Sequence, residues 1–444
     1  MRKVGIISLG CSRNLVDSEV ILGSLKKLGF EVTDVESGVD LCVINTCAFI
    51  DAAREESVDA ILQAAQLKKE GKVGRLVVCG CLPQLYKEKL LKELPEADLV
   101  LGTSDFHKIG SLLSGLKKRE RFAEISDNLN YIYDERSPRL ILTPGHYAYI
   151  KISEGCSNFC SYCIIARLRG AFRSRSIKSV IGEMEGLSAA GRLKEINLIG
   201  QDTTLFGIDR YGKATLGALL KKICGLKDSV RWVRVLYTHP AHYSDELIST
   251  IREEEKVCKY LDLPIQHAND KILKKMNRRT TKGEIKTLIE KLRKNIPGLT
   301  LRTSIIAGFP GESDADFKEV LDFMREVKFE KLGAFIYSKE DLTRAARFQD
   351  QVPENVKKDR FDELMKLQQK VSARINRAFL GKTVDVLIDE KEAGPKNVFL
   401  GRTQRDAPEV DGNVYVTGRD IKVGNFYKVK ITDTLEYDLV GEVV

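Results

Sequence analysis

The sequence has little that belongs in a membrane or in an export pathway. No apolar run among its 444 residues approaches the ~18 residues that a membrane-spanning helix needs. A secretory signal has an apolar core of roughly 7–15 residues before a cleavage site of small residues, and Val4–Gly10 reaches that length only if its glycines and serine are counted. Cys11 follows this run. It could be lipidated, it could be a metal ligand after a buried strand, or it could be a thiol in the core.

The sequence also lacks an arrangement of Ser, His and Asp that would indicate nucleophilic catalysis. It does contain ten cysteines. Without a convincing signal peptide, these indicate a reducing compartment and a cytoplasmic protein, where clustered cysteines bind metal or do chemistry more often than they form disulfides. A hydrophobic content of 43% and a charged content of 30% are typical of a globular protein. The length is sufficient for two or three domains.

We predict an α/β protein of three domains. Residues 1–120 alternate apolar runs with helical stretches, which favours an open parallel α/β sheet. Residues 120–145 contain Ser-Pro and Thr-Pro-Gly and are predicted to be a linker. Six strand–helix units over residues 135–375 predict a (β/α)6 partial barrel, with active-site residues at the C-terminal ends of its strands. Short alternating strands with glycine turns predict a small β-barrel over residues 378–444.

Two helices carry more specific expectations. Asp17, Ser18 and Glu19 are predicted to begin the first helix, where acidic residues suit the positive end of the helix dipole. A long helix is predicted after Pro353, and its apolar stripe is expected to pack against the partial barrel. The stripe consists of Phe361, Leu364, Leu367, Val371 and Ile375.

The strongest motif is "EGCSNFCSYC", which places Cys156, Cys160 and Cys163 at C-x3-C-x2-C spacing directly after a predicted strand. Structural zinc needs four ligands, and no fourth cysteine or histidine lies nearby in the sequence, His146 being the closest. Cysteine thiolates are also the standard ligands of iron–sulfur clusters. Three of them on a four-iron cluster leave one iron open, which is useful when a substrate must bind the metal.

Cys11, Cys47 and Cys81 each end one of the first three apolar runs. The carboxyl ends of parallel strands share one edge of a sheet, so these cysteines are expected to converge there on a second cluster. The alternative is three independent core thiols, since free cysteine is often buried. Core packing is the expectation for the other four cysteines, of which Cys79 is the nearest competitor to Cys81. These four are Cys42, Cys79, Cys224 and Cys258.

The motif at Cys156–Cys163, at the end of the first strand of a βα barrel, resembles the radical S-adenosylmethionine (SAM) superfamily. The segments "LIGQDT" and "IIAGFPGE" match it as well. The resemblance implies that the open iron chelates SAM, and that an electron from the cluster cleaves SAM to methionine and a 5′-deoxyadenosyl radical. It further implies SAM contacts from Tyr162, Gln201, Gly308 and Glu312.

The order of the three domains is similar to that of the methylthiotransferases, and this resemblance covers essentially the whole chain. It implies an auxiliary [4Fe-4S] cluster on Cys11, Cys47 and Cys81, a radical SAM [4Fe-4S] cluster on Cys156, Cys160 and Cys163, and an electron donor as partner. One SAM would supply a methyl group to sulfur, and a second would supply the radical that abstracts hydrogen from the substrate. The clusters and SAM then carry the chemistry, with no side chain as acid or base.

The methylthiotransferases divide into enzymes that modify tRNA adenosine and enzymes that modify an aspartate of ribosomal protein S12. The C-terminal barrel resembles a TRAM domain, which binds RNA in the tRNA enzymes. Here Gly381–Val444 carries nine Lys/Arg and twelve Asp/Glu, a net charge of −3 against +9 for the whole chain. RNA-binding surfaces are basic, so this barrel favours a basic protein partner, unless its charges only form a solvated surface.

Sequence details favour the same branch. "LGCSRNLVDSE", "TPGHYAYIKISEGC" and "GRTQRDAPEVDG", with its segment Asp406–Gly412, resemble the S12-modifying enzymes. Ala166 is a departure, because the family usually has proline there. S12 is therefore the predicted substrate, with the tRNA enzyme as the alternative. A non-enzymatic iron–sulfur carrier is a third hypothesis, which the βα barrel disfavours because a carrier needs no SAM pocket.

Overall fold

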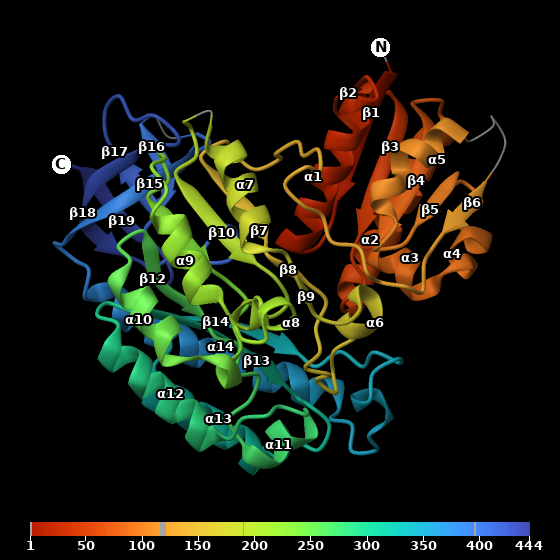
Figure 1. The fold of residues 1–444 in the computed structure, drawn as a ribbon. Helices are drawn as coiled ribbons and strands as arrows, with labels where there is room; N and C mark the ends of the chain where they lie inside the picture. Colours follow the sequence, from red (N-terminus) through yellow and green to blue (C-terminus); the bar gives the residue numbers. More distant parts are fainter. Residues whose placement is uncertain (1, 116–120, 190, 395–396) are drawn as a thin grey trace.

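The N-terminal domain is built on a parallel sheet of six strands in the order β2-β1-β3-β4-β5-β6, at the right of Figure 1. The computed structural model describes residues 2–115, 121–189, 191–394 and 397–444. Helices α1 and α5 cover one face of the sheet, and α2 packs against the other. The strands are β1 (Arg2–Ser8), β2 (Phe30–Val32), β3 (Val39–Thr46), β4 (Val73–Gly80), β5 (Leu99–Leu101) and β6 (Phe122–Glu124), and the helices are α1 (Ser12–Lys27), α2 (Asp51–Lys69), α3 (Cys81–Tyr86), α4 (Glu88–Glu93) and α5 (Ile109–Gly115).

This confirms the predicted open parallel sheet. Strands β3 and β4 are buried on both faces, which explains their nearly continuous apolar sequences. Cys42 and Cys79 lie inside these strands with no exposed surface, as predicted for core thiols. The three-residue edge strands β2 and β6 are too short to give a periodic signal. Strand β6 lies beyond the expected domain boundary at residue 120.

The predicted start of the first helix is wrong. Helix α1 begins at Ser12, directly after Cys11, and its first turn contains no acidic residue. Asp17 and Glu19 lie inside the helix and are buried. Their physical role is therefore not to stabilise a helix end, and both carboxylates instead pair with cations from other parts of the chain.

The central domain contains a second parallel sheet, in which the strand order β7-β10-β11-β12-β13-β14 follows the sequence. Helices that follow these strands pack on its outer side, so the domain is the predicted six-unit partial barrel (Figure 1). The strands are β7 (Tyr147–Lys151), β10 (Glu195–Ile199), β11 (Trp232–Val235), β12 (Val257–Asp262), β13 (Thr300–Ala307) and β14 (Lys331–Ile336), with a short pair β8 (Ser153–Glu154) and β9 (Arg173–Ser174). The helices are α6 (Ile165–Arg169), α7 (Ile177–Ser188), α8 (Ile208–Tyr211), α9 (Leu216–Cys224), α10 (Asp245–Glu253), α11 (Asp270–Lys275), α12 (Lys282–Asn295) and α13 (Asp314–Val327).

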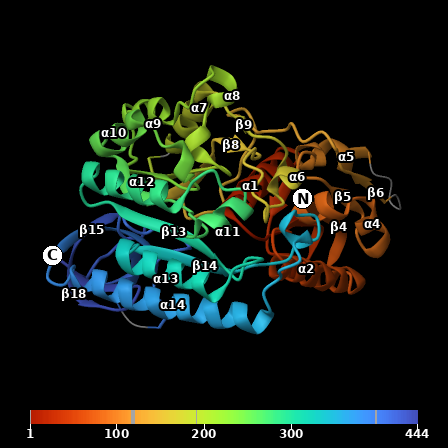
Figure 2. The ribbon, with the colours of Figure 1, turned by 90° about the horizontal axis from the view of Figure 1, so that it is seen from below.

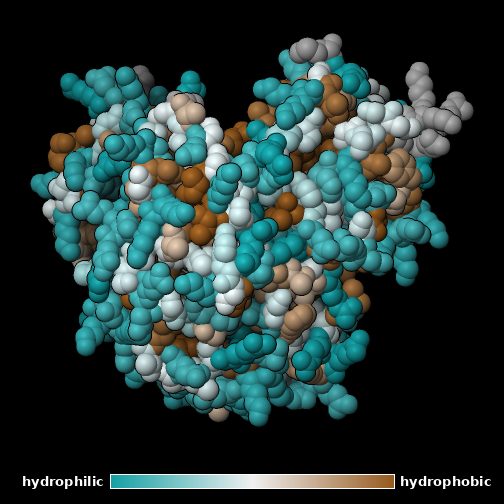
Figure 3. All heavy atoms as spheres, viewed as in Figure 1, coloured by the Kyte–Doolittle hydropathy of each residue, from teal (hydrophilic) through white to brown (hydrophobic). Residues whose placement is uncertain are grey.

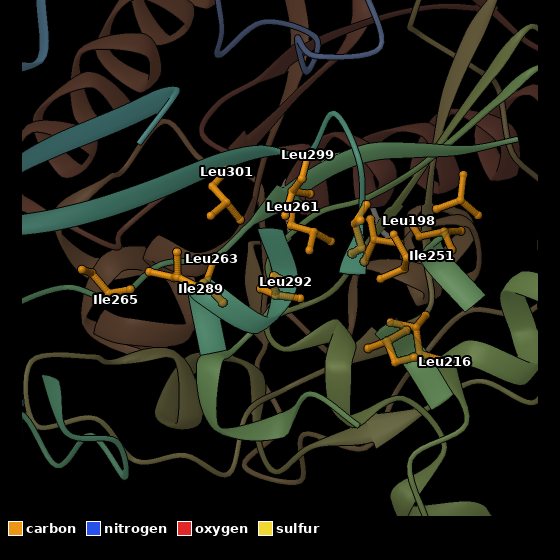
Figure 4. Close-up of a cluster of buried hydrophobic side chains, with 14 of the residues drawn as sticks. Leu198, Leu216, Ile251, Leu261, Leu263, Ile265, Ile289, Leu292, Leu299 and Leu301 are labelled. Carbon is orange, nitrogen blue, oxygen red and sulfur yellow. The ribbon is translucent and has the colours of Figure 1, made fainter. Parts of the chain in front are cut away.

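The core of this domain lies between the sheet and its helices. Aliphatic side chains from the strands, such as Leu198, Leu261 and Leu301, lie among Ile251, Leu292 and other side chains of the helices, as Figure 4 shows. Cys258 is also buried, whereas Cys224 is partly exposed at the end of α9.

Helix α14 (Glu354–Arg377) lies along β13 and β14 and reaches the C-terminal barrel (Figure 2). The predicted packing is confirmed, but the predicted stripe is not the most buried one. Only Leu364 of that stripe is fully buried, and the other four are partly buried. The buried line consists mainly of polar residues, whose side chains find partners in the central domain or, for Asn376, in the C-terminal barrel: Lys357, Arg360, Leu364, Gln368, Ser372 and Asn376.

The C-terminal domain is a closed five-stranded barrel in the order β15-β16-β17-β19-β18, as predicted. Its strands are β15 (Thr383–Lys391), β16 (Val398–Arg402), β17 (Val414–Thr417), β18 (Phe426–Thr434) and β19 (Leu439–Val443). None of the helices in the described ranges combines the length and the apolar character that crossing a bilayer requires.

The segment Asp406–Gly412 joins this barrel to the central domain. Lys331 donates to Asp406 at 2.6 Å, Tyr147 donates to Glu409 at 3.1 Å, and Tyr260 donates to Asp411 at 2.7 Å. These acidic side chains therefore hold the two domains together.

The predicted linker is packed between domains. Arg139 donates to Glu19 of α1 at 2.7 Å and to Glu183 of α7 at 2.6 Å, and its own side chain is only 6% exposed. The connection thus fixes the N-terminal domain against the central domain. On the face shown in Figure 3, a notch separates the N-terminal domain from the side that carries the barrel.

Candidate functional site

The C-x3-C-x2-C loop lies between β8 and β9, beyond the end of the first strand of the central sheet. All three cysteines are free and partly exposed. The backbone N–H of Cys156 donates to Gly170 at 3.1 Å, and Ser161 bonds to the end of α11 through its N–H and its hydroxyl. The loop is therefore anchored on both sides, as a ligand-bearing loop should be.

The electrostatics of this loop suit a metal-binding thiolate set. Burial, together with the neighbouring cysteines, raises the pKa of Cys156 to about 11 and that of Cys163 to about 12. A metal must therefore displace protons here. Arg278, 3.9 Å from the sulfur of Cys160, supplies positive charge beside the loop.

The N-terminal cysteines lie at the carboxyl ends of three adjacent parallel strands, as predicted. Cys47 and Cys81 directly follow β3 and β4, and Cys11 lies just after β1. Gly10, with φ of +88°, approaches Cys47 so closely that an added Cβ would lie 2.9 Å from its sulfur. Asn14 holds the strand ends together, because its side-chain amide donates to the backbone oxygens of Leu9, Asn45 and Thr46.

These cysteines lie close enough to influence one another. Burial raises the pKa of Cys47 to about 12, and Cys81 and Cys11 add to this shift. Burial also acts on Cys11, but the charge and hydrogen bond of Arg13, together with Arg169, outweigh it and lower the pKa of that thiol. Among the described residues, neither cysteine triad has its donor atoms all within 4.8 Å of one another, the spacing that one ion would need. Both sets therefore suit a multi-iron cluster better than a single ion.

Two arginines connect the N-terminal triad to the central domain. Helix α6 begins directly after the C-x3-C-x2-C loop, and its last residue, Arg169, reaches the sulfur of Cys81 at 3.6 Å and Asn14 at 3.0 Å. From the opposite side, Nε of Arg13 donates to the sulfur of Cys11 at 3.4 Å, while Nη1 donates to the carbonyl of Gly200 in the central domain at 3.0 Å. The cysteine-bearing edges of the two domains consequently face each other.

A buried ionic network fixes this arrangement. Asp17 of α1 accepts from Lys151 at 2.5 Å and from Arg169 at 2.5 Å, and Lys151 also donates to Glu154 at 2.6 Å. All four side chains are at most 4% exposed. Two cations thus match two carboxylates, which is how buried charge is tolerated. The pKa of Glu154 is held low because Lys151 and Arg169 outweigh the effect of burial.

Two of the predicted SAM contacts border the C-x3-C-x2-C loop. Gln201 donates to Glu154 at 2.5 Å, while its other side-chain atom, Oε1, is buried with no hydrogen-bond partner. An unpaired buried acceptor is costly unless a ligand satisfies it. Tyr162 lies edge-to-face on Phe309 of the "GFPG" turn, with ring centroids 6.5 Å apart. These contacts bring the loop and the turn together.

Gly308 and Glu312 shape that turn. Gly308 has φ of +74°, and an added Cβ would lie 2.2 Å from a side-chain carbon of Lys357. The buried carboxylate of Glu312 accepts from Arg360 at 2.8 Å and from the N–H of Gly308, and it bonds to His267 at 3.2 Å. Because its oxygens already have partners, Glu312 orders the turn, and its predicted contact with SAM stays a prediction.

Asp202, His239 and His242 lie beside the same loop and have donor atoms within 4.8 Å of one another. Asp202 accepts from Asn158 of the loop at 2.8 Å and bonds to His242 at 2.8 Å. Burial lowers the pKa of His239 to about 2, so that this ring is neutral. Asp202 thus joins His242 to Asn158 of the loop, while Nδ1 of His239 accepts from the N–H of Ala241 at 3.2 Å.

Sequence reasoning missed the cations that connect the N-terminal triad to the central domain. Arg13 and Arg169 each lie within six residues of a cysteine in the printed sequence, but such proximity is common and gave no signal. Lys151 lies in a strand that is otherwise apolar or aromatic, "YAYIK", and a charge in a buried strand is the one hint that the sequence offered.

A cavity of about 770 Å³ lies between the N-terminal domain and the segment 340–342, and none of the six cysteines is among its lining residues. Its lining includes residues 85–89 and 123–127, and Ile164, which follows Cys163, borders it. The charged residues of the lining carry both signs, so the cavity itself selects no charge.

Comparisons with known proteins agree with this layout. Residues 3–102 match the family model described as Uncharacterized protein family UPF0004, residues 150–324 match the Radical SAM superfamily, and residues 380–444 match the TRAM domain. The chain is 47% identical over 442 residues to "Ribosomal protein uS12 methylthiotransferase RimO" of Geotalea uraniireducens, covering 100% of this chain and 98% of the relative. The protein of the same name from Clostridioides difficile is 45% identical over 445 residues, covering 100% and 99%.

Solved structures share the fold at low identity. The radical SAM methyltransferase TsrM from Kitasatospora setae superposes with a TM-score of 0.56 at 14% identity, covering 75% of this chain and 73% of that one. The cobalamin-dependent SAM radical enzyme OxsB gives a TM-score of 0.52 at 14% identity, covering 83% and 56%.

Proposed function

The chain belongs to the family of ribosomal protein uS12 methylthiotransferases called RimO, and on that premise we propose that it adds a methylthio group to the β-carbon of an aspartate in ribosomal protein S12. It is a radical SAM methylthiotransferase. The observation that carries the mechanism is that two cysteine triads, from two domains, lie on edges that face each other across Arg13 and Arg169.

The residues present fit two [4Fe-4S] clusters and SAM. Each triad offers three free thiols in an anchored loop or at a strand end, and three thiolates leave one iron of a four-iron cluster open. Cys156, Cys160 and Cys163 would hold the radical SAM cluster, and the auxiliary cluster would be held by Cys11, Cys47 and Cys81. The unpaired Oε1 of Gln201 offers an acceptor to SAM. The ring of Tyr162 and the closely approaching backbone of Gly308 border the same space.

When bound, these groups supply the methyl group, the sulfur and, with an electron from an outside donor, the radical that removes hydrogen from the target carbon. The protein has the task of holding the two centres near one another and keeping water away. The network of Asp17, Lys151, Glu154 and Arg169 does the first, because it links α1, β7, β8 and α6 through buried charges. Such pairs are rigid only when every partner is present.

The substrate assignment is supported by the relatives, whose names specify uS12, more than by the charge of the barrel. Four of the acidic side chains counted in that charge are engaged at the seam with the central domain, in contacts with Lys331, Tyr147, Tyr260 and His146. These four are Asp389, Asp406, Glu409 and Asp411. They are consequently not available to a basic partner. A ribosomal substrate also places the enzyme in the cytoplasm, and tRNA is the substrate that we expect to be left unmodified.

The two-cluster proposal can be tested by iron content. Anaerobically reconstituted protein should hold about eight irons per chain, from two four-iron clusters. Cys11→Ala should lose about four irons and all methylthio transfer, yet still cleave SAM reductively, because it keeps the second triad. Cys42→Ala is the matched control, since Cys42 is buried inside β3 away from the strand end, and it should retain the iron content of the wild type. Full iron and full activity in Cys11→Ala would rule out the ligand role of Cys11.

A further inference from the structure

Arg13 has a guanidinium group that no carboxylate neutralises among the described residues. Its contacts are the sulfur of Cys11 at 3.4 Å, the carbonyl of Gly200 at 3.0 Å and the ring of Tyr237, whose centroid lies 4.3 Å from the guanidinium carbon. Within the described residues, the N–H groups on Nη2 of Arg13 have no hydrogen-bond partner, and this nitrogen is not fully buried. This edge of the guanidinium group is therefore open to a ligand.

The other cations near the triads are already occupied or differently placed. Lys151 and Arg169 share Asp17 and Glu154. Arg278 has no ion pair with any described residue, but of the two triads it contacts only the radical SAM triad, through Cys160, and it donates to the carbonyl of Pro264 at 2.5 Å. Arg13 alone among these four combines contact with the N-terminal triad, contact with the central domain and a free donor edge.

The backbone of the central domain is strained to support this position. Tyr237 has φ of +57°, a left-handed conformation that a residue with a Cβ keeps only where the surroundings fix it. Its N–H donates to Asp262 at 2.9 Å, and its hydroxyl lies 3.3 Å from that of Ser12. The tyrosine ring thus forms a platform for Arg13, directly beside Cys11.

We propose that Arg13 binds the side-chain carboxylate of the substrate aspartate and thereby sets both the position of its β-carbon and the preference of the enzyme for an acidic target residue. The inference rests on the proposed function, because the target must be an aspartate whose β-carbon lies between the two triads. The open Nη2 of Arg13 can donate a charge-assisted hydrogen bond to this carboxylate, and such bonds are shorter and stronger than those between neutral groups. The β-carbon of the aspartate is bonded to that carboxylate, and it is the atom that must lie close to both cysteine triads. The same charge offsets the repulsion between an acidic substrate and a site rich in thiolates.

The test compares two substrates and three enzyme variants. The substrates are S12 with its native target aspartate and S12 with asparagine at that position, which keeps the shape and removes the charge. Arg13→Gln removes the guanidinium group, and Arg13→Lys keeps a positive charge without the planar guanidinium group. Arg252→Gln is the control, because Arg252 is an exposed arginine that pairs with its neighbour Glu253. Methylthiolation, affinity for each substrate, iron content and 5′-deoxyadenosine formed without substrate are measured anaerobically for each enzyme.

The wild type should prefer aspartate over asparagine by roughly 10- to 150-fold, the value of a hydrogen bond to a charged group. In Arg13→Gln this preference should fall to near unity in both affinity and turnover. Arg13→Lys should retain an intermediate preference, and it decides the matter if Arg13→Gln loses iron. Arg252→Gln should match the wild type.

An undiminished preference for aspartate in iron-replete Arg13→Gln or Arg13→Lys would overturn the inference, because it would show Arg13 to be a structural contact only. Failure of the wild type to modify S12 would instead overturn the proposed function on which the inference rests. The two failures are therefore distinguishable in one experiment.

Discussion

Asp17→Asn should loosen the N-terminal domain from the central domain. In the wild type each carboxylate oxygen of Asp17 accepts from one cation, Lys151 at 2.5 Å and Arg169 at 2.5 Å. Asparagine has the same shape but offers one acceptor and one donor, so one cation faces an N–H group. The network then holds two cations against Glu154 alone. Breaking a buried ion pair in this way costs about 3–5 kcal/mol.

This cost corresponds to a roughly 150- to 4,000-fold larger equilibrium constant for opening, since 1.4 kcal/mol is a factor of ten. Hydrogen exchange read by mass spectrometry should detect it in peptides from α1 and β7, which pack together at this contact. Asp322→Asn is the matched control, because Asp322 forms ion pairs with Lys318 and Arg325 on the surface, where such pairs contribute about 0–1 kcal/mol. Equal exchange rates in α1 and β7 for Asp17→Asn and wild type would refute the role given to the network.

Two further predictions concern a strand end and the domain seam. Gly10→Ala should abolish the auxiliary cluster, because its Cβ would lie 2.9 Å from the sulfur of Cys47. Gly29→Ala is the control and should keep full iron content, because Gly29 has a similar φ of +82° but open space around it. Equal iron content in the two variants would contradict this prediction. Burial raises the pKa of Asp406, but Lys331 and the hydrogen bonds to this carboxyl outweigh it and lower the pKa below its usual value. A carboxyl group with a lowered pKa stabilises the fold at pH values above its unfolded pKa of ~3.9, and this stabilisation is lost as the pH falls through its folded pKa. Urea unfolding can be followed by the fluorescence of the single tryptophan, which lies beside the barrel. The wild type should be more stable than Asp406→Asn, and this difference in stability should shrink below about pH 4. A constant difference across that range would count against the ion pair.

The domain order and the cysteine positions could be predicted because they depend on local patterns. Apolar runs that alternate with helical stretches report a parallel sheet, and the direction of parallel strands then places Cys11, Cys47 and Cys81 on one edge. Cys42 and Cys79 could be assigned to the core because they lie within the strands rather than at their ends.

The contacts between domains could not be predicted in this way. Asp17 and Glu19 suit a helix start by local rules, but α1 begins at Ser12, and the two carboxylates pair instead with Lys151, Arg169 and Arg139, which lie more than a hundred residues away. The apolar stripe predicted for α14 is another case in which contacts between distant segments, rather than the local sequence pattern, decide which side chains are buried.

On that helix, Lys357, Arg360 and Gln368 are more buried than most of the apolar residues beside them, because each finds a hydrogen-bond partner in the central domain. Periodicity in the sequence registers apolar residues only, so a polar interface of this kind leaves no signal.

The substrate can be identified by incubating the reconstituted enzyme anaerobically with SAM, a reductant and either S12 or tRNA, and by analysing both substrates by mass spectrometry. We expect one aspartate of S12 to gain a methylthio group in place of hydrogen and tRNA to be unchanged. Modification of tRNA alone, with S12 left unmodified, would contradict this expectation.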